Sequence, residues 1–278
     1  MLASSMLVLA FASTADAQSV VINEVLFNSS VVSDRYGEWV ELYNAGSDDL
    51  DINGWTLADD HYDSHVIDNG GPLMIPAGGF LVMAGSADFE LNGGVVADYA
   101  WGTDNYDGFA LSNVGDEVAL FDVDGVLQDW MYYVHYGAIH GYSVELLHPV
   151  MDNATPLSWA RATTAYYTVE SGNRSQYGTP GWENGVLWSE EDQVEVIVEG
   201  IDDLVDDGSI NNGQANALQS KLDNILAQVD RGNTTAAQNQ LDAFVNQVEA
   251  LLASGAITQE QADVLFEQAE LLQAMIDA

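Results

Sequence analysis

The sequence contains no cysteine and very few basic residues. Five Lys and Arg side chains stand against 44 Asp and Glu in 278 residues, which gives a formal net charge of −39. Without cysteine the chain has no disulfide, no Cys-ligated zinc and no thiol nucleophile. So acidic a surface repels phosphate groups, so we expect no nucleic-acid partner. It suits a protein kept soluble in saline surroundings; divalent cations would bind it only weakly, and no cofactor is expected.

Long hydrophobic runs are also missing. No segment has eighteen consecutive apolar residues, so we expect no membrane span. The apolar run Met6–Ala12 is followed by Ala15-Asp-Ala17, a small-x-small cleavage pattern, and residues 1–17 therefore read as a secretory signal peptide. This segment departs from the usual pattern because no Lys or Arg precedes its apolar run. We expect a mature protein that begins at Gln18 and is secreted or held at the cell surface.

Residues 18–186 have the pattern of an all-β domain. Trp39–Tyr43 alternates between two faces, with Val40 and Leu42 on one and Glu41 and Tyr43 on the other. Clusters of Gly, Asn and Asp separate such runs at the spacing of a sandwich, and Asp122-Val-Asp-Gly125 predicts a hairpin turn. The expected strands lie in Val20–Phe27, Trp39–Tyr43, Trp55–Leu57, Phe80–Met83, Phe109–Leu111, Val118–Phe121 and Asp129–Val134.

The order of several motifs in this part of the chain resembles a known family. The motifs are Val20-Val-Ile-Asn-Glu-Val25, Glu38-Trp-Val-Glu-Leu-Tyr-Asn44, Gly54-Trp-Thr-Leu57, Ile75–Val82, Leu111–Leu120, Asp122–Gly125, Asp129, Tyr142–Leu146 and Gly178-Thr-Pro-Gly181 with Asn184. Together they resemble the lamin tail domain of bacterial secreted proteins. That resemblance implies an immunoglobulin-like β-sandwich and an accessory module, and it names no activity.

From residue 190 onward the pattern is helical and contains no proline. We assign residues 187–207 to a linker and first helix, although Val194–Val198 also fits a strand, and residues 208–278 to an antiparallel bundle. Gly208–Leu218 is echoed by Gly255–Leu265, 47 residues later, each with a terminating Gly and an N-cap. The Leu, Ala and Phe spacing of residues 208–276, including Ala237, Leu241, Phe244 and Val248, resembles the FIMAH domain.

Asp59-Asp-His-Tyr-Asp-Ser-His65 is the one cluster with the composition of a metal site. Its carboxylate and imidazole side chains are of the types that bind Zn²⁺, and they belong to Asp59, Asp60, His61, Asp63 and His65. The spacing of His61 and His65 would place both on one side of a helix, but the cluster follows a strand and is expected to be a loop. No third ligand is identifiable either, so we interpret the cluster as a polar hairpin loop.

Aromatic residues are dense in Trp130–Tyr142. If they were exposed, aromatic side chains here could stack on sugar rings, and the candidates are Trp130, Tyr132, Tyr133, Tyr136 and Tyr142. Strand alternation, however, places about half of such residues in the core.

Catalytic motifs are absent from the sequence. Ser143 and Ser158 lack a Gly-x-Ser-x-Gly setting, and no glycine-rich phosphate loop occurs. We therefore predict a non-catalytic binding or structural module with a protein or glycan partner at the cell surface. The alternatives are a glycan-binding accessory protein that uses the aromatic residues and, third, an accessory subunit of a secreted hydrolase or nuclease.

Overall fold

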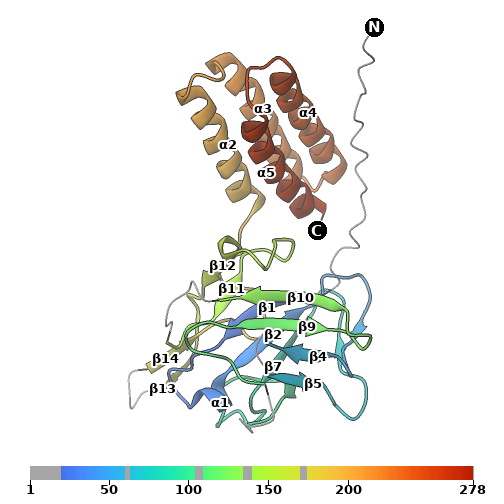
Figure 1. The fold of residues 1–278 in the computed structure, drawn as a ribbon, viewed down its shortest axis with the longest axis vertical. Helices are drawn as coiled ribbons and strands as arrows, with labels where there is room; N and C mark the ends of the chain where they lie inside the picture. Colours follow the sequence, from blue (N-terminus) through green and yellow to red (C-terminus); the bar gives the residue numbers. More distant parts are fainter. Residues whose placement is uncertain (1–19, 60–62, 104–108, 134–139, 170–173, 278) are drawn as a thin grey trace. The chain divides into compact units, whose positions relative to one another are not determined.

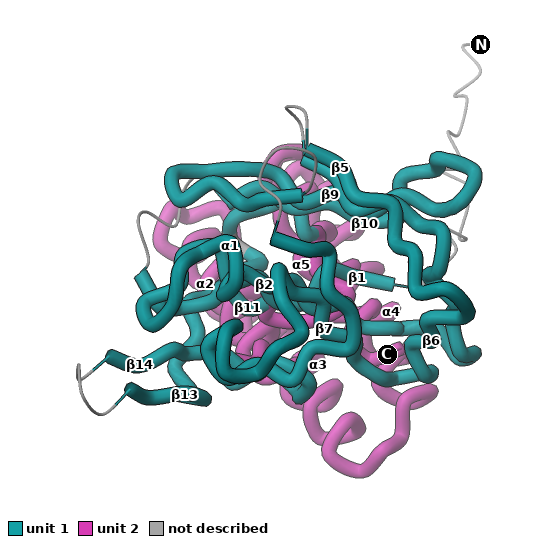
Figure 2. Tube along the Cα trace, turned by 90° about the horizontal axis from the view of Figure 1, so that it is seen from below, with its two compact units in different colours: residues 1–145, 153–185 teal, residues 146–152, 186–278 magenta. Residues whose placement is uncertain are grey.

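The computed structural model describes residues 20–59, 63–103, 109–133, 140–169 and 174–277. They form two compact units, one of residues 1–145 and 153–185, and one of residues 146–152 and 186–278 (Figure 2). The first is built from strands and the second from four helices, so the expected β-sandwich followed by an all-α bundle is confirmed. Within the described ranges no helix has the length and hydropathy needed to cross a membrane.

The first unit contains two main sheets, whose strands overlap in the view of Figure 1. The six-stranded sheet has the order β12 (Trp159–Arg161), β11 (Val144–Leu146), β1 (Val21–Leu26), β2 (Trp39–Tyr43), β7 (Phe80–Ala84) and β8 (Tyr99–Ala100). The four-stranded sheet has the order β10 (Leu127–Tyr132), β9 (Glu117–Phe121), β4 (Thr56–Ala58) and β5 (Ser64–Val66). The Asp129 carboxylate of β10 joins them by accepting a hydrogen bond from the Ile22 backbone N–H of β1 at 2.6 Å.

Both faces of the six-stranded sheet are covered. Val40 and Leu42 of β2 are buried on one face, as their alternation predicts. Trp39 is buried on the other, where Val95 and Tyr166 pack beside it. A strand that is covered on both sides has no solvent-facing positions, and for this reason all six residues of β1 are buried.

Short elements complete this unit. They are helix α1 (Asp34–Gly37), the ribbon β13 (Ala165–Val169) with β14 (Arg174–Tyr177), the ribbon β3 (Leu50–Asp51) with β6 (Met74–Ile75), and the 3₁₀ turn Pro156–Ser158. The hairpin turn expected at Asp122–Gly125 joins β9 to β10, with Gly125 at φ +74° and its N–H bonded to the Asp122 carbonyl. The strand expected at Phe109–Leu111 is wrong: the Leu111 N–H is bonded to the side chain of Glu38 instead of to a neighbouring strand.

The second unit is a bundle of α2 (Glu190–Asp206), α3 (Asn212–Val229), α4 (Thr234–Ala253) and α5 (Gln259–Asp277). The segment Val194–Val198 is helical and not a strand. The predicted N-caps are present: Asn211 accepts from the Gln214 N–H at 3.1 Å, and Thr258 accepts from the Gln261 N–H at 3.2 Å. The apolar residues of α2, which the sequence analysis placed in a segment before the bundle, lie in the same core as those of α3, α4 and α5.

Candidate functional site

Two described residues of the acidic segment, Asp59 and Asp63, bond to each other between β4 and β5. The Asp59 carboxylate accepts from the Asp63 N–H at 2.9 Å, and the Asp59 N–H donates to the Asp63 carbonyl at 3.0 Å. His65 lies on β5 and places its Nε2 2.6 Å from the Tyr99 hydroxyl, while burial lowers its pKa. Asp60 and His61 lie outside the described residues. Across the described residues, no three His, Asp or Glu side chains are close enough to hold a metal ion.

The aromatic candidates separate into three environments. Tyr133 is buried, stacks on Phe27 with ring centroids 4.2 Å apart, and donates its hydroxyl to the Ser112 carbonyl at 2.9 Å. It is therefore a core residue and not a ligand-binding group. Tyr136 lies outside the described residues.

Tyr142 is in contact with two other side chains. The Tyr177 ring stacks on it with centroids 4.3 Å apart, and the Arg161 guanidinium carbon lies 4.4 Å from the centre of the same ring. Part of the Tyr142 ring that a sugar would need is therefore already engaged by other side chains.

Trp130 and Tyr132 are exposed on one face of β10. Their exposed fractions are 37% and 42%, while Met131 between them is fully buried. Across the strand pair, Trp130 lies opposite Ala119 and Tyr132 opposite Glu117 of β9. The structure therefore keeps two of the five aromatic candidates together on an accessible sheet face.

A row of buried glutamates crosses the six-stranded sheet, and the sequence analysis did not identify it. The strand register pairs Glu24 of β1 with Glu41 of β2 and with Glu145 of β11, and none of the three has exposed surface. Neighbours on adjacent strands have Cβ atoms about 5 Å apart. An acidic residue inside the apolar run Val20–Phe27 was the available signal.

The segment after β14 covers this row and supplies neutral donors to it. Glu24 accepts from the Ser143 hydroxyl at 2.5 Å and from Thr179, whereas Glu41 accepts from the Gly181 N–H and from the Asn23 amide at 2.7 Å. The pKa of Glu41 is raised to about 8 and that of Glu24 well above its usual value, chiefly by burial and also by the neighbouring carboxyl groups. Donors within the protein therefore bond to the carboxyl groups of Glu24 and Glu41. The bonds from Thr179 and Gly181 hold the segment after β14, the closing segment of the sandwich, onto the sheet.

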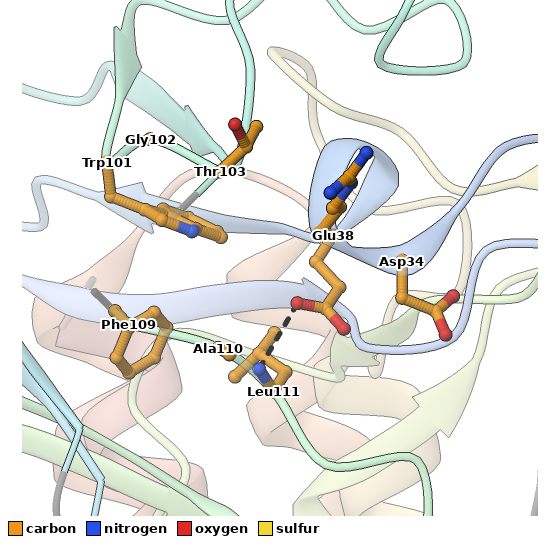
Figure 3. A pocket seen from close by; sticks show the side chains of 9 residues that line it. Asp34, Glu38, Trp101, Gly102, Thr103, Phe109, Ala110 and Leu111 are labelled. Atoms are coloured by element: carbon orange, nitrogen blue, oxygen red, sulfur yellow. Dashed lines mark hydrogen bonds between the residues drawn. The ribbon is translucent and has the colours of Figure 1, made fainter. Parts of the chain in front are cut away.

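A cavity of about 190 Å³ opens beside the start of β2 (Figure 3). Its lining includes Glu38, Asp34, Trp101, Phe109 and Leu111. The Trp101 and Phe109 rings meet edge to face, with centroids 5.3 Å apart and planes at 84°. The Glu38 carboxylate lies opposite them and accepts from the Leu111 N–H at 3.2 Å. Sequence reasoning missed this cavity because its walls come from two parts of the chain, residues 34–38 and residues 101–103 with 109–111, that are far apart in the sequence.

Residues 13–135 match the family model of the Lamin Tail Domain, and residues 194–274 match that of the FIMAH domain. A search of curated proteins finds no match to the chain. The chain thus carries a lamin tail domain and a FIMAH domain, as its motifs predicted, and strands β11 to β14 lie beyond the matched part of the sandwich. Both are non-catalytic domain types, which indicates a structural or binding module.

Proposed function

We propose that this protein is an exported, non-catalytic module that binds a cell-surface or extracellular partner through the outer face of the four-stranded sheet. The observation that carries the proposal is the joint exposure of Trp130 and Tyr132 on β10. Monomeric proteins rarely leave large apolar side chains clustered in water, and such clusters mark binding surfaces.

The strand register extends this apolar face beyond β10. Leu127 lies opposite Phe121 of β9, Phe121 lies opposite Thr56 of β4, and Thr56 lies opposite Val66 of β5. Leu127 is 46% exposed and Val66 60% exposed. Because paired residues share a face, these side chains lie on the same side of the sheet as Trp130 and Tyr132. The face therefore presents exposed apolar side chains on β10 and β5, with Phe121 of β9 and Thr56 of β4 between them.

A glycan is the second candidate partner, and the pair of exposed rings favours it. Aromatic rings that stand side by side on a sheet can pack against the C–H faces of successive sugars. The acidic surface directs this choice toward neutral or cationic glycans, since anionic chains would be repelled.

The test is binding of the full chain to a glycan array and to intact cells of the producing organism. In whichever of the two assays the unaltered chain binds, the double variant Trp130→Ala with Tyr132→Ala should lose that binding. Trp182→Ala is the matched control, because Trp182 is 76% exposed and lies outside this sheet. Cell binding without glycan binding would favour a protein partner, and binding that survives the double variant would contradict the proposed surface.

Export has its own test. If residues 1–17 are a signal peptide, the exported protein begins at Gln18. N-terminal mass spectrometry of the exported product checks this, and an intact Met1 would contradict it.

A further inference from the structure

The cavity beside β2 is separate from the apolar sheet face, and its chemistry points to a different kind of ligand. A water molecule takes about 30 Å³ of liquid volume, so a space of about 190 Å³ matches roughly six waters or a compact organic molecule. Ligand cavities for larger, drug-sized molecules begin at about 300 Å³. The volume therefore suits a small molecule.

Two aromatic rings form a corner in this cavity. Trp101 and Phe109 are 6% and 3% exposed, and their planes are close to perpendicular. The faces of aromatic rings carry negative electrostatic potential, and cages of two or more rings recognise organic ammonium groups through it. This corner is suited to a methylated or alkyl-substituted cation.

A carboxylate faces the corner. Glu38 is 3% exposed, and the Leu111 N–H is the one hydrogen-bond donor to its carboxylate among the described residues. Asp34 adds a second acidic group to the lining; its own oxygens accept from the Ser29 N–H at 3.0 Å and the Asn113 amide at 2.9 Å. A buried carboxylate with a single neutral donor lacks the compensation that buried charge requires.

Within the described part of the chain no cationic side chain pairs with Glu38. Arg35 lies at the lining, but its guanidinium rests over the Tyr36 ring at 4.5 Å and donates to the Tyr36 hydroxyl at 2.8 Å. A cation from solution would pair with the ionised form of Glu38.

We propose that this cavity binds a small organic ammonium ion, with the carbon atoms around the nitrogen packed into the corner formed by Trp101 and Phe109 and its positive charge held by Glu38. The cavity supplies a group for each part of such an ion: two rings for the alkyl groups, one carboxylate for the charge, and a volume suited to a compact molecule. The proposal stands independently of the sheet-face function, because no residue is shared between the two places.

The protonation state of Glu38 couples this binding to pH. Its pKa is raised to about 8, chiefly by burial and to a lesser degree by the charges of Asp34 and Asp116, while the hydrogen bond from the Leu111 N–H acts in the opposite direction. Tyr133 also lies near this carboxyl, and burial keeps its hydroxyl protonated by raising its pKa. Near neutral pH the empty cavity therefore holds mostly protonated Glu38. A bound cation favours the carboxylate, so binding should release close to one proton and tighten roughly tenfold per pH unit up to about pH 8.

The test is isothermal titration calorimetry of the full chain with choline, with 3,3-dimethylbutan-1-ol as its uncharged analogue. Work at about 1 M NaCl shortens the Debye length to about 3 Å and so screens diffuse attraction by the acidic surface. Choline should bind saturably at one site, the alcohol should bind at least about tenfold more weakly, and titrations in two buffers of different ionisation heat should reveal the released proton.

Glu38→Gln is the diagnostic variant, because it keeps an acceptor for the Leu111 N–H and cannot ionise. It should weaken choline binding at pH 8.5 by about tenfold or more and abolish both the pH dependence and the proton release. Glu90→Gln is the control, because Glu90 is exposed and its substitution removes the same charge at a position outside the cavity. Equal binding of choline and the alcohol to the unaltered chain, no binding of either, or unchanged binding in Glu38→Gln would each overturn the proposal.

Discussion

Thr179 donates two hydrogen bonds to the Glu24 carboxylate, one from its backbone N–H at 2.9 Å and one from its hydroxyl at 3.0 Å. The two residues are 155 positions apart, and the bonds attach the closing segment of the sandwich to its first strand. The same hydroxyl lies 3.4 Å from Glu145 on the neighbouring strand. One threonine thus serves two buried acids.

Removing that hydroxyl should destabilise the sandwich. Thr179→Val keeps the shape and the backbone donor but removes one hydrogen bond from each of two buried carboxyl groups, and we expect a loss of about 1–3 kcal/mol in the free energy of unfolding. Thr179→Ser keeps the hydroxyl and is the matched control. Urea unfolding followed by tryptophan fluorescence measures both, and equal stability of the two variants would show that the hydroxyl contributes nothing.

Stability of the sandwich should fall as the pH rises from about 6.5 to 8.5. Glu41 has a folded-state pKa of about 8 against an ordinary value of 4.5, so the folded state holds more protons than the unfolded state in this window. Stability decreases with pH wherever the folded state binds more protons. Glu24 and Glu38, whose pKa values are also raised by burial, act in the same direction.

The lower limit of that window is set by the histidines. Burial lowers the pKa of His65 and of His148, so their contribution rises with pH and opposes the glutamates below about pH 6.5. Differential scanning calorimetry at several pH values gives the slope. The melting temperature of Glu41→Gln should fall less with pH than that of the unaltered chain. A melting temperature that is constant or rises with pH would contradict the claim that these buried glutamates are protonated in the folded state.

The melting temperature should also rise with salt. The formal charge of −39 creates self-repulsion, and the Debye length falls from about 30 Å at 0.01 M to about 3 Å at 1 M salt. Thermal unfolding in a NaCl series, with the pH held constant, measures the effect. A flat response would mean that the surface charge is already neutralised locally or by bound cations.

Local pattern predicted much of the fold, because each such feature depends on residues close in sequence. Alternation separated Val40 and Leu42 from Glu41, and the same rule separates exposed Trp130 and Tyr132 from buried Met131 and Tyr133. The caps at Asn211 and Thr258 follow from a glycine, a polar residue and a Gln three positions later.

The buried acids could not be predicted in this way. Glu24, Glu41 and Glu145 become neighbours only when β11 and β2 take their places on either side of β1, and that order is not a local property. Glu38 faces its cavity because Leu111, 73 residues later, approaches it without forming a strand. In both cases the sequence shows an acidic residue beside apolar ones, whereas the partner that explains it comes from a distant segment.

The last prediction concerns the two units as separate folding domains. The bundle has a core of its own, to which all four helices contribute, and α2 begins with Ser189 and Asp192 bonded to each other as a capping box. Leu187, just before this cap, is 58% exposed. Limited proteolysis should therefore cut close to Leu187, and residues 186–278 alone should give a helical circular dichroism spectrum.

Residues 18–186 alone should give a β-type spectrum, with somewhat lower stability than in the full chain. That fragment lacks Trp188, whose N–H donates to the Leu147 carbonyl at 2.9 Å. Residues 146–152 therefore lose a bond that holds them in place. A longer fragment, 18–189, restores this bond and is the control. An unfolded 18–186 fragment, together with a single melting transition of the full chain, would show that the two units fold as one and would remove the basis for assigning the sheet face to an independent binding domain.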